Sequence, residues 1–211
     1  MLNAIPLNHF CSHSLKFLKI LNRIFLRVVC SSNFHKLRFR KKLAEMDKLQ
    51  WTKDIFGSKL EIKQGGEQIG KIHWENMLSS KAQAMINGKL FTLNREFFLS
   101  KLEIYDANDQ SLLGMVMVNM FSPRSDVVIN GKRFELEIQN FWQSRWSWKF
   151  NGEEIITFTS NEFITKDKGD IHLSSSLTEE IEVLILLGLF VRNQFVLFML
   201  LGIAVALFVI L

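Results

Sequence analysis

The residues of this chain that could do chemistry are few and scattered. His9, Cys11 and His13 are zinc-ligand types, but a tetrahedral site needs a further ligand and the sequence holds no second Cys/His cluster to supply it. The adjacent carboxylates Glu153 and Glu154 sit at a turn, where we interpret them as solvated surface. A glycine-rich phosphate loop and a Gly-x-Ser-x-Gly elbow are absent from the sequence. We therefore expect no enzyme activity, no metal and no cofactor.

The segment Phe141–Trp148 is rich in aromatic residues, which could stack on a ligand or a nucleobase. Strand alternation, however, places Trp146 and Trp148 on one face, where related segments of this chain carry Leu and Ile. We expect these two side chains to pack in a core, so no ligand-binding residue is assigned.

The positive charge of the chain is confined to its first part. The net charge is +5, but residues 1–45 hold nine basic residues and one acid, whereas residues 46–211 are slightly acidic. A nucleic-acid-binding domain carries its basic residues on the folded body. We therefore expect no nucleic-acid partner.

The basic segment has the pattern of an amphipathic helix. Lys16, Lys19, Arg23 and Arg27 fall on one helical face and apolar residues fill the others. Such a helix lies at an anionic membrane surface or acts as a targeting presequence. The alternative is that Met46, at the change of composition, is the true start and residues 1–45 are an over-extended reading frame.

The middle of the chain repeats a strand pattern three times. Ser58-Lys59-Leu60-Glu61-Ile62 recurs unchanged at 100–104, and a related copy with tryptophans at its two apolar positions stands at 144–148. Each copy alternates apolar and polar residues, as half-buried strands do. A turn and a second apolar run follow each copy, at 69–74, 112–118 and 155–159.

Further hairpins lie between these units. Ile-Asn-Gly-Lys-x-Phe occurs at 86–91 and again at 129–134, and Asn-Gly between apolar runs is the strongest short signal for a hairpin. In the third unit we expect residues 163–173 to form a hairpin around Gly169. Three units of two hairpins predict twelve strands.

The pattern then changes to a helical one. Ser176 and Glu179 have the spacing of a capping box, and Glu179, Glu180 and Glu182 suit the positive end of a helix dipole. Residues 181–191 are apolar on nearly every side. We expect a helix over 177–191 that is buried in protein or in lipid.

The tail 195–211 contains no polar side chain. As a helix it would reach about 25 Å, close to the roughly 30 Å of a hydrocarbon core, and it predicts a C-terminal membrane anchor. Arg192, Lys168 and Lys166 precede it and no charge follows, which favours a cytoplasmic body. The alternative is a helical hairpin of 181–191 and 195–211 in lipid, although its first arm is short.

Twelve strands in repeated hairpins, followed by a very hydrophobic helix at 176–191, resemble the tubby-like superfamily, which includes the tubby C-terminal domain, the LURP-one-related proteins and the phospholipid scramblases. The resemblance covers about residues 51–191 and implies a twelve-stranded barrel closed around its C-terminal helix. The phosphoinositide-binding residues of tubby have no matching motif here. A sandwich or a small propeller with a membrane tail is the alternative architecture.

The sequence thus predicts a mainly β protein in three parts: a basic leader or over-extended start (1–45), a barrel domain with a buried helix at 177–191 (46–191), and a membrane anchor (195–211). We expect a membrane-tethered, non-enzymatic barrel that binds lipid or a membrane-associated partner; the identity of a protein partner is open. Two alternatives are phospholipid translocation, which rests on fold analogy alone, and an interaction module without a ligand.

Overall fold

The structure is a computed structural model that describes residues 49–54, 56–76, 78–96, 101–118, 124–139, 144–162, 166–174 and 178–210. The predicted basic segment 1–45, with its possible metal ligands, lies outside the described residues, as do Phe141, Trp142 and Ser176.

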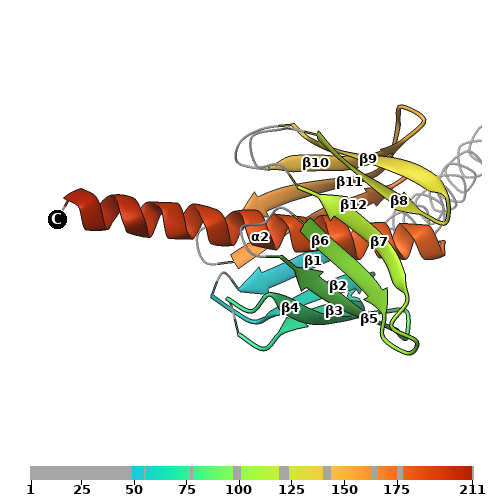
Figure 1. The fold of residues 1–211 in the computed structure, drawn as a ribbon, viewed down its shortest axis with the longest axis horizontal. Helices are drawn as coiled ribbons and strands as arrows, with labels where there is room; N and C mark the ends of the chain where they lie inside the picture. Colours follow the sequence, from blue (N-terminus) through green and yellow to red (C-terminus); the bar gives the residue numbers. More distant parts are fainter. Residues whose placement is uncertain are drawn as a thin grey trace, which may run out of the picture. The chain divides into compact units, whose positions relative to one another are not determined.

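Twelve antiparallel strands form a nearly closed barrel around one long helix (Figure 1). The strands are β1 (Leu49–Asp54), β2 (Lys59–Gln64), β3 (Glu67–Trp74), β4 (Lys81–Ile86), β5 (Lys89–Arg95), β6 (Lys101–Asp106), β7 (Leu112–Met117), β8 (Arg124–Ile129), β9 (Lys132–Ile138), β10 (Arg145–Phe150), β11 (Glu153–Glu162) and β12 (Lys166–Leu173). The helix is α2 (Glu179–Ile210). This result confirms the predicted mainly β barrel and excludes the sandwich and the propeller.

Apart from β7 and β8, strands that are neighbours in sequence pair with each other, and β1 also pairs with β12. The sheet therefore has one seam, between β7 and β8, which lie side by side without a hydrogen-bonded ladder. Side chains close this seam. A Cβ on Gly114 of β7 would lie 3.2 Å from Val127 Cγ2 and 3.3 Å from Ile129 Cγ1, both on β8.

The sequence repeats correspond to structural repeats. The Asn-Gly pairs at 87–88, 130–131 and 151–152 all form hairpin turns in which both residues have positive φ, as a type I′ turn requires. The pairing register also shifts at the same place in each unit, after Ile62, Ile104 and Trp148. The three units thus share the positions of their register shifts as well as the order of their strands.

The number of strands agrees with the prediction, but two strands differ from it. Residues 166–173 form the single strand β12 instead of a hairpin around Gly169, and Leu49–Asp54 supplies the additional strand β1. Gly169 lies mid-strand because β11 approaches closely there: a Cβ would stand 1.6 Å from the backbone oxygen of Thr159. This glycine marks a close contact between strands and was misread as a turn.

The barrel interior is filled by inward-facing strand residues and by the first half of α2 (Figure 1). Trp146 and Trp148 are buried in this core, as predicted. The helix begins after Thr178, whose hydroxyl accepts a hydrogen bond from the amide of Ile181 (3.5 Å). Thr178 therefore takes the capping position that the sequence assigned to Ser176.

The helix also differs from the prediction in having no break between residues 191 and 195. Arg192, Asn193 and Gln194 were expected to separate a buried helix from a membrane anchor. They are buried inside the barrel instead, and burial continues to Val196 and Leu197. A buried carboxylate partner for Arg192 allows the charged residue to stay within the barrel.

Candidate membrane-anchoring site

The N-terminal end of α2 is fixed by the hairpin turns at one end of the barrel, which we call the inner end. Glu182 accepts a hydrogen bond from Asn87 Nδ2 (2.7 Å), and Lys89 Nζ lies 3.2 Å from its other oxygen. Lys132 Nζ lies 2.9 Å from Glu180 Oε1. Both Ile-Asn-Gly-Lys turns therefore bind the first turn of the helix.

These contacts shift the pKa values of Glu180 and Lys89. The hydrogen bond from Lys132, followed by that from its own backbone amide and that from Thr178, lowers the pKa of Glu180 to about 2. The hydrogen bond with Glu182 raises the pKa of Lys89. The first turn of α2 is therefore held by ion pairs with the lysine of each turn.

Further along, the side chains of the barrel wall hold the middle of the helix. Trp148 donates a hydrogen bond from Nε1 to the carbonyl oxygen of Leu184 (2.8 Å). Gly188 leaves room for the rings of Phe158 and Trp148, since a Cβ there would stand 2.6 Å from Phe158 Cζ. Trp74 stacks on Phe190 with ring centroids 6.1 Å apart.

A buried ion pair lies where α2 approaches the opposite end of the barrel, which we call the exit end. Arg192 donates to both carboxylate oxygens of Asp167 on β12, from Nε (3.1 Å) and Nη2 (3.2 Å). Both side chains are almost fully buried, at 3% and 4% exposure. Ser160 of β11 joins the pair, since its hydroxyl donates to Asp167 (3.0 Å) and accepts from Arg192 (3.3 Å).

Lys53 of β1 adds a second buried cation to this layer. Its burial lowers its pKa, against the opposing attraction of Asp167 and Asp54. Its ammonium group donates to the carbonyl oxygen of Asp54 (3.1 Å) and lies 5.6 Å from the ring centroid of Trp74. Gln194, two residues nearer the exit than Arg192, is also buried, and its amide has no hydrogen-bond partner among the described residues.

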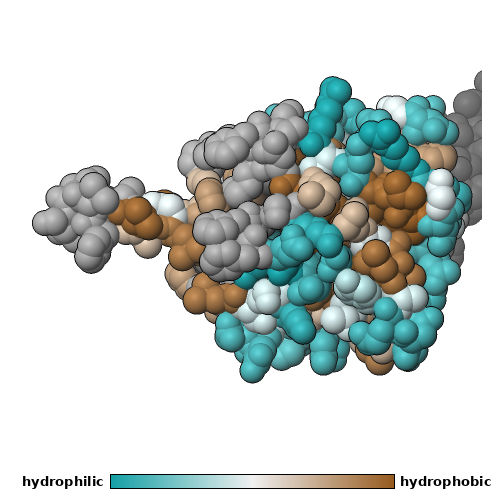
Figure 2. Space-filling model, in the orientation of Figure 1, coloured by the Kyte–Doolittle hydropathy of each residue, from teal (hydrophilic) through white to brown (hydrophobic). Residues whose placement is uncertain are grey.

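Beyond this layer the helix emerges from the barrel. Phe198 is 45% exposed, and Leu201, Ile203 and Val205 are each more than half exposed. Figure 2 shows the helix projecting from the barrel with an apolar surface. Exposed apolar side chains on successive turns of one helix form a patch of the kind that marks a protein or membrane contact.

In the described part of the chain, α2 is the one helix long and apolar enough to cross a membrane, with a mean hydropathy of 2.1 over its most apolar window. Barrel walls bury 78% of that window. Length and composition alone therefore describe a barrel-core helix equally well. The distinguishing feature is the exposed section after Leu197.

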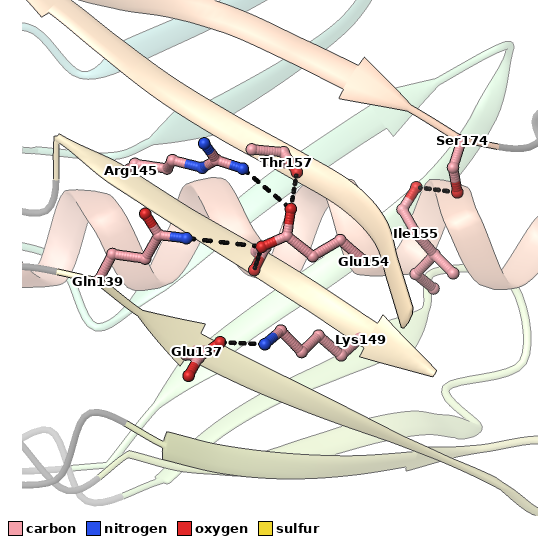
Figure 3. A network of polar contacts seen from close by, with 9 residues as sticks. Glu137, Gln139, Arg145, Lys149, Glu154, Ile155, Thr157 and Ser174 are labelled. Atoms are coloured by element: carbon pink, nitrogen blue, oxygen red, sulfur yellow. Dashed lines mark hydrogen bonds and ion pairs between the residues drawn. The ribbon is translucent and has the colours of Figure 1, made fainter. Parts of the chain in front are cut away.

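The outer wall of β9, β10 and β11 carries a separate polar network (Figure 3). Glu154 accepts hydrogen bonds from Arg145 (3.0 Å), Ser147 (3.2 Å) and Thr157 (3.2 Å), and Glu137 pairs with Lys149. Burial would raise the pKa of Glu154, but these hydrogen bonds lower it on balance. Glu154 is thus a partly buried, ionised group that joins strands, and not the solvated residue that the sequence indicated.

A shallow hollow of about 110 Å³ beside this network is lined by Arg124, Glu135, Leu136, Glu137, Lys149 and Gly152. Among its lining residues, Glu137 pairs with both Arg124 and Lys149. Within the described residues, no group of three or more His, Cys, Asp or Glu side chains is placed to hold a metal ion.

Comparison of the chain with protein-family models, with curated proteins and with solved structures finds no match.

Sequence reasoning identified the apolar helix but missed the polar groups that hold it. The lysine that follows each Asn-Gly pair, together with three glutamates in the first helical turn, could have indicated the inner contacts. The ion pair was harder to foresee because Arg192 and Asp167 are 25 residues apart and stand in an apolar helix and a glycine-containing strand.

Proposed function

We propose that this protein is a membrane-tethered, non-enzymatic β-barrel whose C-terminal helix anchors it in lipid, and that it binds lipid or a membrane-associated partner. The observation that carries the proposal is the run of exposed apolar side chains on α2 from Phe198 onward. An isolated apolar helix in water would leave this surface hydrated at a cost of about 25 cal/mol per Å².

Membership of the tubby-like superfamily remains part of the same proposal. Its support is the meander of twelve strands around a hydrophobic C-terminal helix. A cytoplasmic body is proposed from the lysines at the exit end, Lys166 and Lys168. Arg192 no longer contributes to that argument, because it is buried and paired with Asp167.

Flotation of the full-length chain with vesicles tests the tethering. The variant carries Leu201→Asp and Val205→Asp, at helix positions 51% and 64% exposed. The matched control carries Leu112→Asp and Val128→Asp, at barrel-wall positions 51% and 57% exposed. All four substitutions are at exposed sites and leave the core packing intact.

The vesicles contain phosphatidylcholine and phosphatidylserine, and the chain is synthesised in their presence. A carboxylate deep in hydrocarbon costs about 3 kcal/mol. We expect the wild type and the wall control to float and the helix variant to stay in the dense fraction. Equal flotation of all three proteins, or of none, would refute anchorage by α2.

A further inference from the structure

The exposed section of α2 leaves the barrel without a polar spacer. Val196 and Leu197 are buried by the barrel wall, and Phe198, the next residue, is already an exposed apolar side chain. Residues 195–205 include no polar side chain at all. A helix that passes directly from a protein wall into lipid brings that wall to the lipid surface.

Two described loop residues at the barrel end around this exit are exposed and apolar. Phe56, between β1 and β2, is 76% exposed, and Leu78, between β3 and β4, is 57% exposed. Both loops lie at the exit end, because Asp54 pairs with Lys166 beside the Arg192–Asp167 contact and Trp74 stacks on Phe190. In Figure 2 the apolar surface of the helix continues onto the adjoining end of the barrel.

The sequences of the connections differ between the two ends. Among the described residues, two connections at the exit end each hold an exposed large apolar residue, Phe56 and Leu78. The turns at the inner end are polar or glycine-rich: Gly65-Gly66, Asn87-Gly88, Ala107–Ser111, Asn130-Gly131 and Asn151-Gly152. The contrast follows the direction in which α2 leaves the barrel.

Exposed apolar residues also occur near the inner end, at Leu90 (50%) and Leu112 (51%). They lie at the starts of strands beside polar turns, whereas the exposed section of α2 leaves at the other end of the barrel. Exposure alone therefore does not single out the exit end. Its distinction is that α2 leaves the barrel at this end, with no polar residue between the buried Val196 and Leu197 and the exposed Phe198.

We propose that the exit end of the barrel, at Phe56 and Leu78, rests directly on the bilayer, with these side chains in the interfacial region and the barrel axis steeply inclined to the membrane plane. The occupant of this surface is the lipid headgroup and upper acyl region. The inference rests on the proposed anchorage by α2. It adds a second membrane contact, made by the barrel wall itself.

The consequence for function is a fixed orientation. A barrel attached only through a flexible linker would present all of its faces to the solvent and to partners. A barrel seated on its exit end holds its inner turns, including Asn87-Gly88 and Asn130-Gly131, away from the membrane. A soluble partner would then meet the inner end or the barrel side, and a lipid would meet the exit end.

Site-specific fluorescent labelling of the full chain tests this orientation. Cys11 and Cys30 are replaced by serine, and one cysteine is introduced as Phe56→Cys, Leu78→Cys, Leu90→Cys or Leu112→Cys. All four positions are at least half exposed, so a small environment-sensitive dye at any of them leaves the core undisturbed. Each protein is placed in phosphatidylcholine and phosphatidylserine vesicles, with or without lipid that carries a nitroxide near its headgroup.

We expect dyes at positions 56 and 78 to shift their emission to the blue and to lose most of their intensity when nitroxide lipid is present. Dyes at positions 90 and 112 should retain a water-like spectrum and full intensity. If the proteins float but dyes at positions 56 and 78 show the same water-like, unquenched emission as dyes at positions 90 and 112, the exit end does not contact the bilayer. That result would overturn this proposal but not the anchorage by α2. Quenching at all four positions would overturn the proposal in favour of a barrel lying on its side.

A blue shift at positions 56 and 78 without quenching by nitroxide lipid would mean that protein covers them, and it would also overturn the proposal. Proteins that do not float at all would refute the anchorage and the seating together. Repeating the labelling at positions 56 and 78 independently guards against a local effect of either substitution.

Discussion

Replacement of Gly188 by alanine tests how tightly the barrel encloses α2. An added Cβ would stand 2.6 Å from Phe158 Cζ, 2.8 Å from its Cε2 and 3.0 Å from Trp148 Nε1. The Phe158 ring is fully buried and stacks on Trp146 with centroids 5.1 Å apart, so it has little room to move. Gly202 is the matched control, since it lies on the same helix with no atom within 4 Å of an added Cβ.

The difference in the free energy of unfolding between the two variants measures the steric cost of the added methyl group at position 188. Both substitutions gain helix propensity, about 1 kcal/mol relative to glycine. Only Gly188→Ala forces a methyl group into a filled core, which costs about 1–3 kcal/mol. We therefore expect the free energy of unfolding of Gly188→Ala to lie about 1–3 kcal/mol below that of Gly202→Ala.

Denaturant unfolding in mild detergent, followed by tryptophan fluorescence, measures this difference through the transition midpoints. Trp146 and Trp148 border the helix and report its departure from the barrel. Gly188→Val, with two further methyl groups, should lower the midpoint more than Gly188→Ala. Equal midpoints for the variants at positions 188 and 202 would mean that α2 does not run through the barrel.

Three further predictions concern the groups that hold the helix and the sheet. Asp167→Asn removes the buried carboxylate that Arg192 pairs with and should lower the free energy of unfolding by about 3–5 kcal/mol. Arg192→Met leaves Lys53 as a cation near Asp167 and should cost less; the reverse order in denaturant titrations would contradict this account of the exit-end layer. The pKa of Glu180 falls from an ordinary 4.5 to about 2, so its contribution to stability is complete above pH 4.5 and is lost as the pH falls toward 2. Glu180→Gln should therefore lower the free energy of unfolding at pH 7 and flatten its dependence on pH between 4.5 and 2. An unchanged pH profile would show that the pair with Lys132 does not form. Gly169→Ala sets a Cβ 1.6 Å from a backbone oxygen and should destabilise by about 3 kcal/mol in the same titration, whereas a neutral result would restore the turn interpretation.

Strand alternation and Asn-Gly turns were sufficient to predict most of the barrel. The units that begin at Ser58, Ser100 and Ser144 have apolar residues at their inward positions, and they form strands where they were expected. Periodicity succeeds there because the residues that face the core are the ones that carry the pattern.

The pattern failed at two strands for a physical reason. In β1 the inward positions are Leu49, Trp51 and Lys53, and in β12 they include Asp167 and Gly169. A lysine, an aspartate and a glycine at core positions conceal the alternation. Asp167 pairs with Arg192 from the helix and attracts Lys53, so the pattern is broken by the residues that form the polar layer near the exit end.

The end of the buried part of the helix was misplaced for the same reason. Arg192-Asn193-Gln194 is the one polar interruption in the apolar run, and polar residues usually mark the edge of a buried segment. Burial of Arg192 depends on a partner 25 residues away, which no local pattern contains. The exposed apolar loops at the exit end were also invisible to sequence reasoning, because only the closed barrel gathers them at one end.

Photocrosslinking from two phenylalanine positions of α2 tests most directly that this helix runs through the barrel and then enters lipid. Phe190 is fully buried and stacks on Trp74, whereas Phe198, two turns further on, is 45% exposed. Each is replaced in turn by p-benzoylphenylalanine in the full chain, and the protein is irradiated in phosphatidylcholine and phosphatidylserine vesicles before mass spectrometry. We expect position 190 to crosslink to barrel peptides such as the one containing Trp74, and position 198 to form lipid adducts. Lipid adducts at both positions would contradict the enclosed helix, and lipid adducts at neither would contradict the anchor.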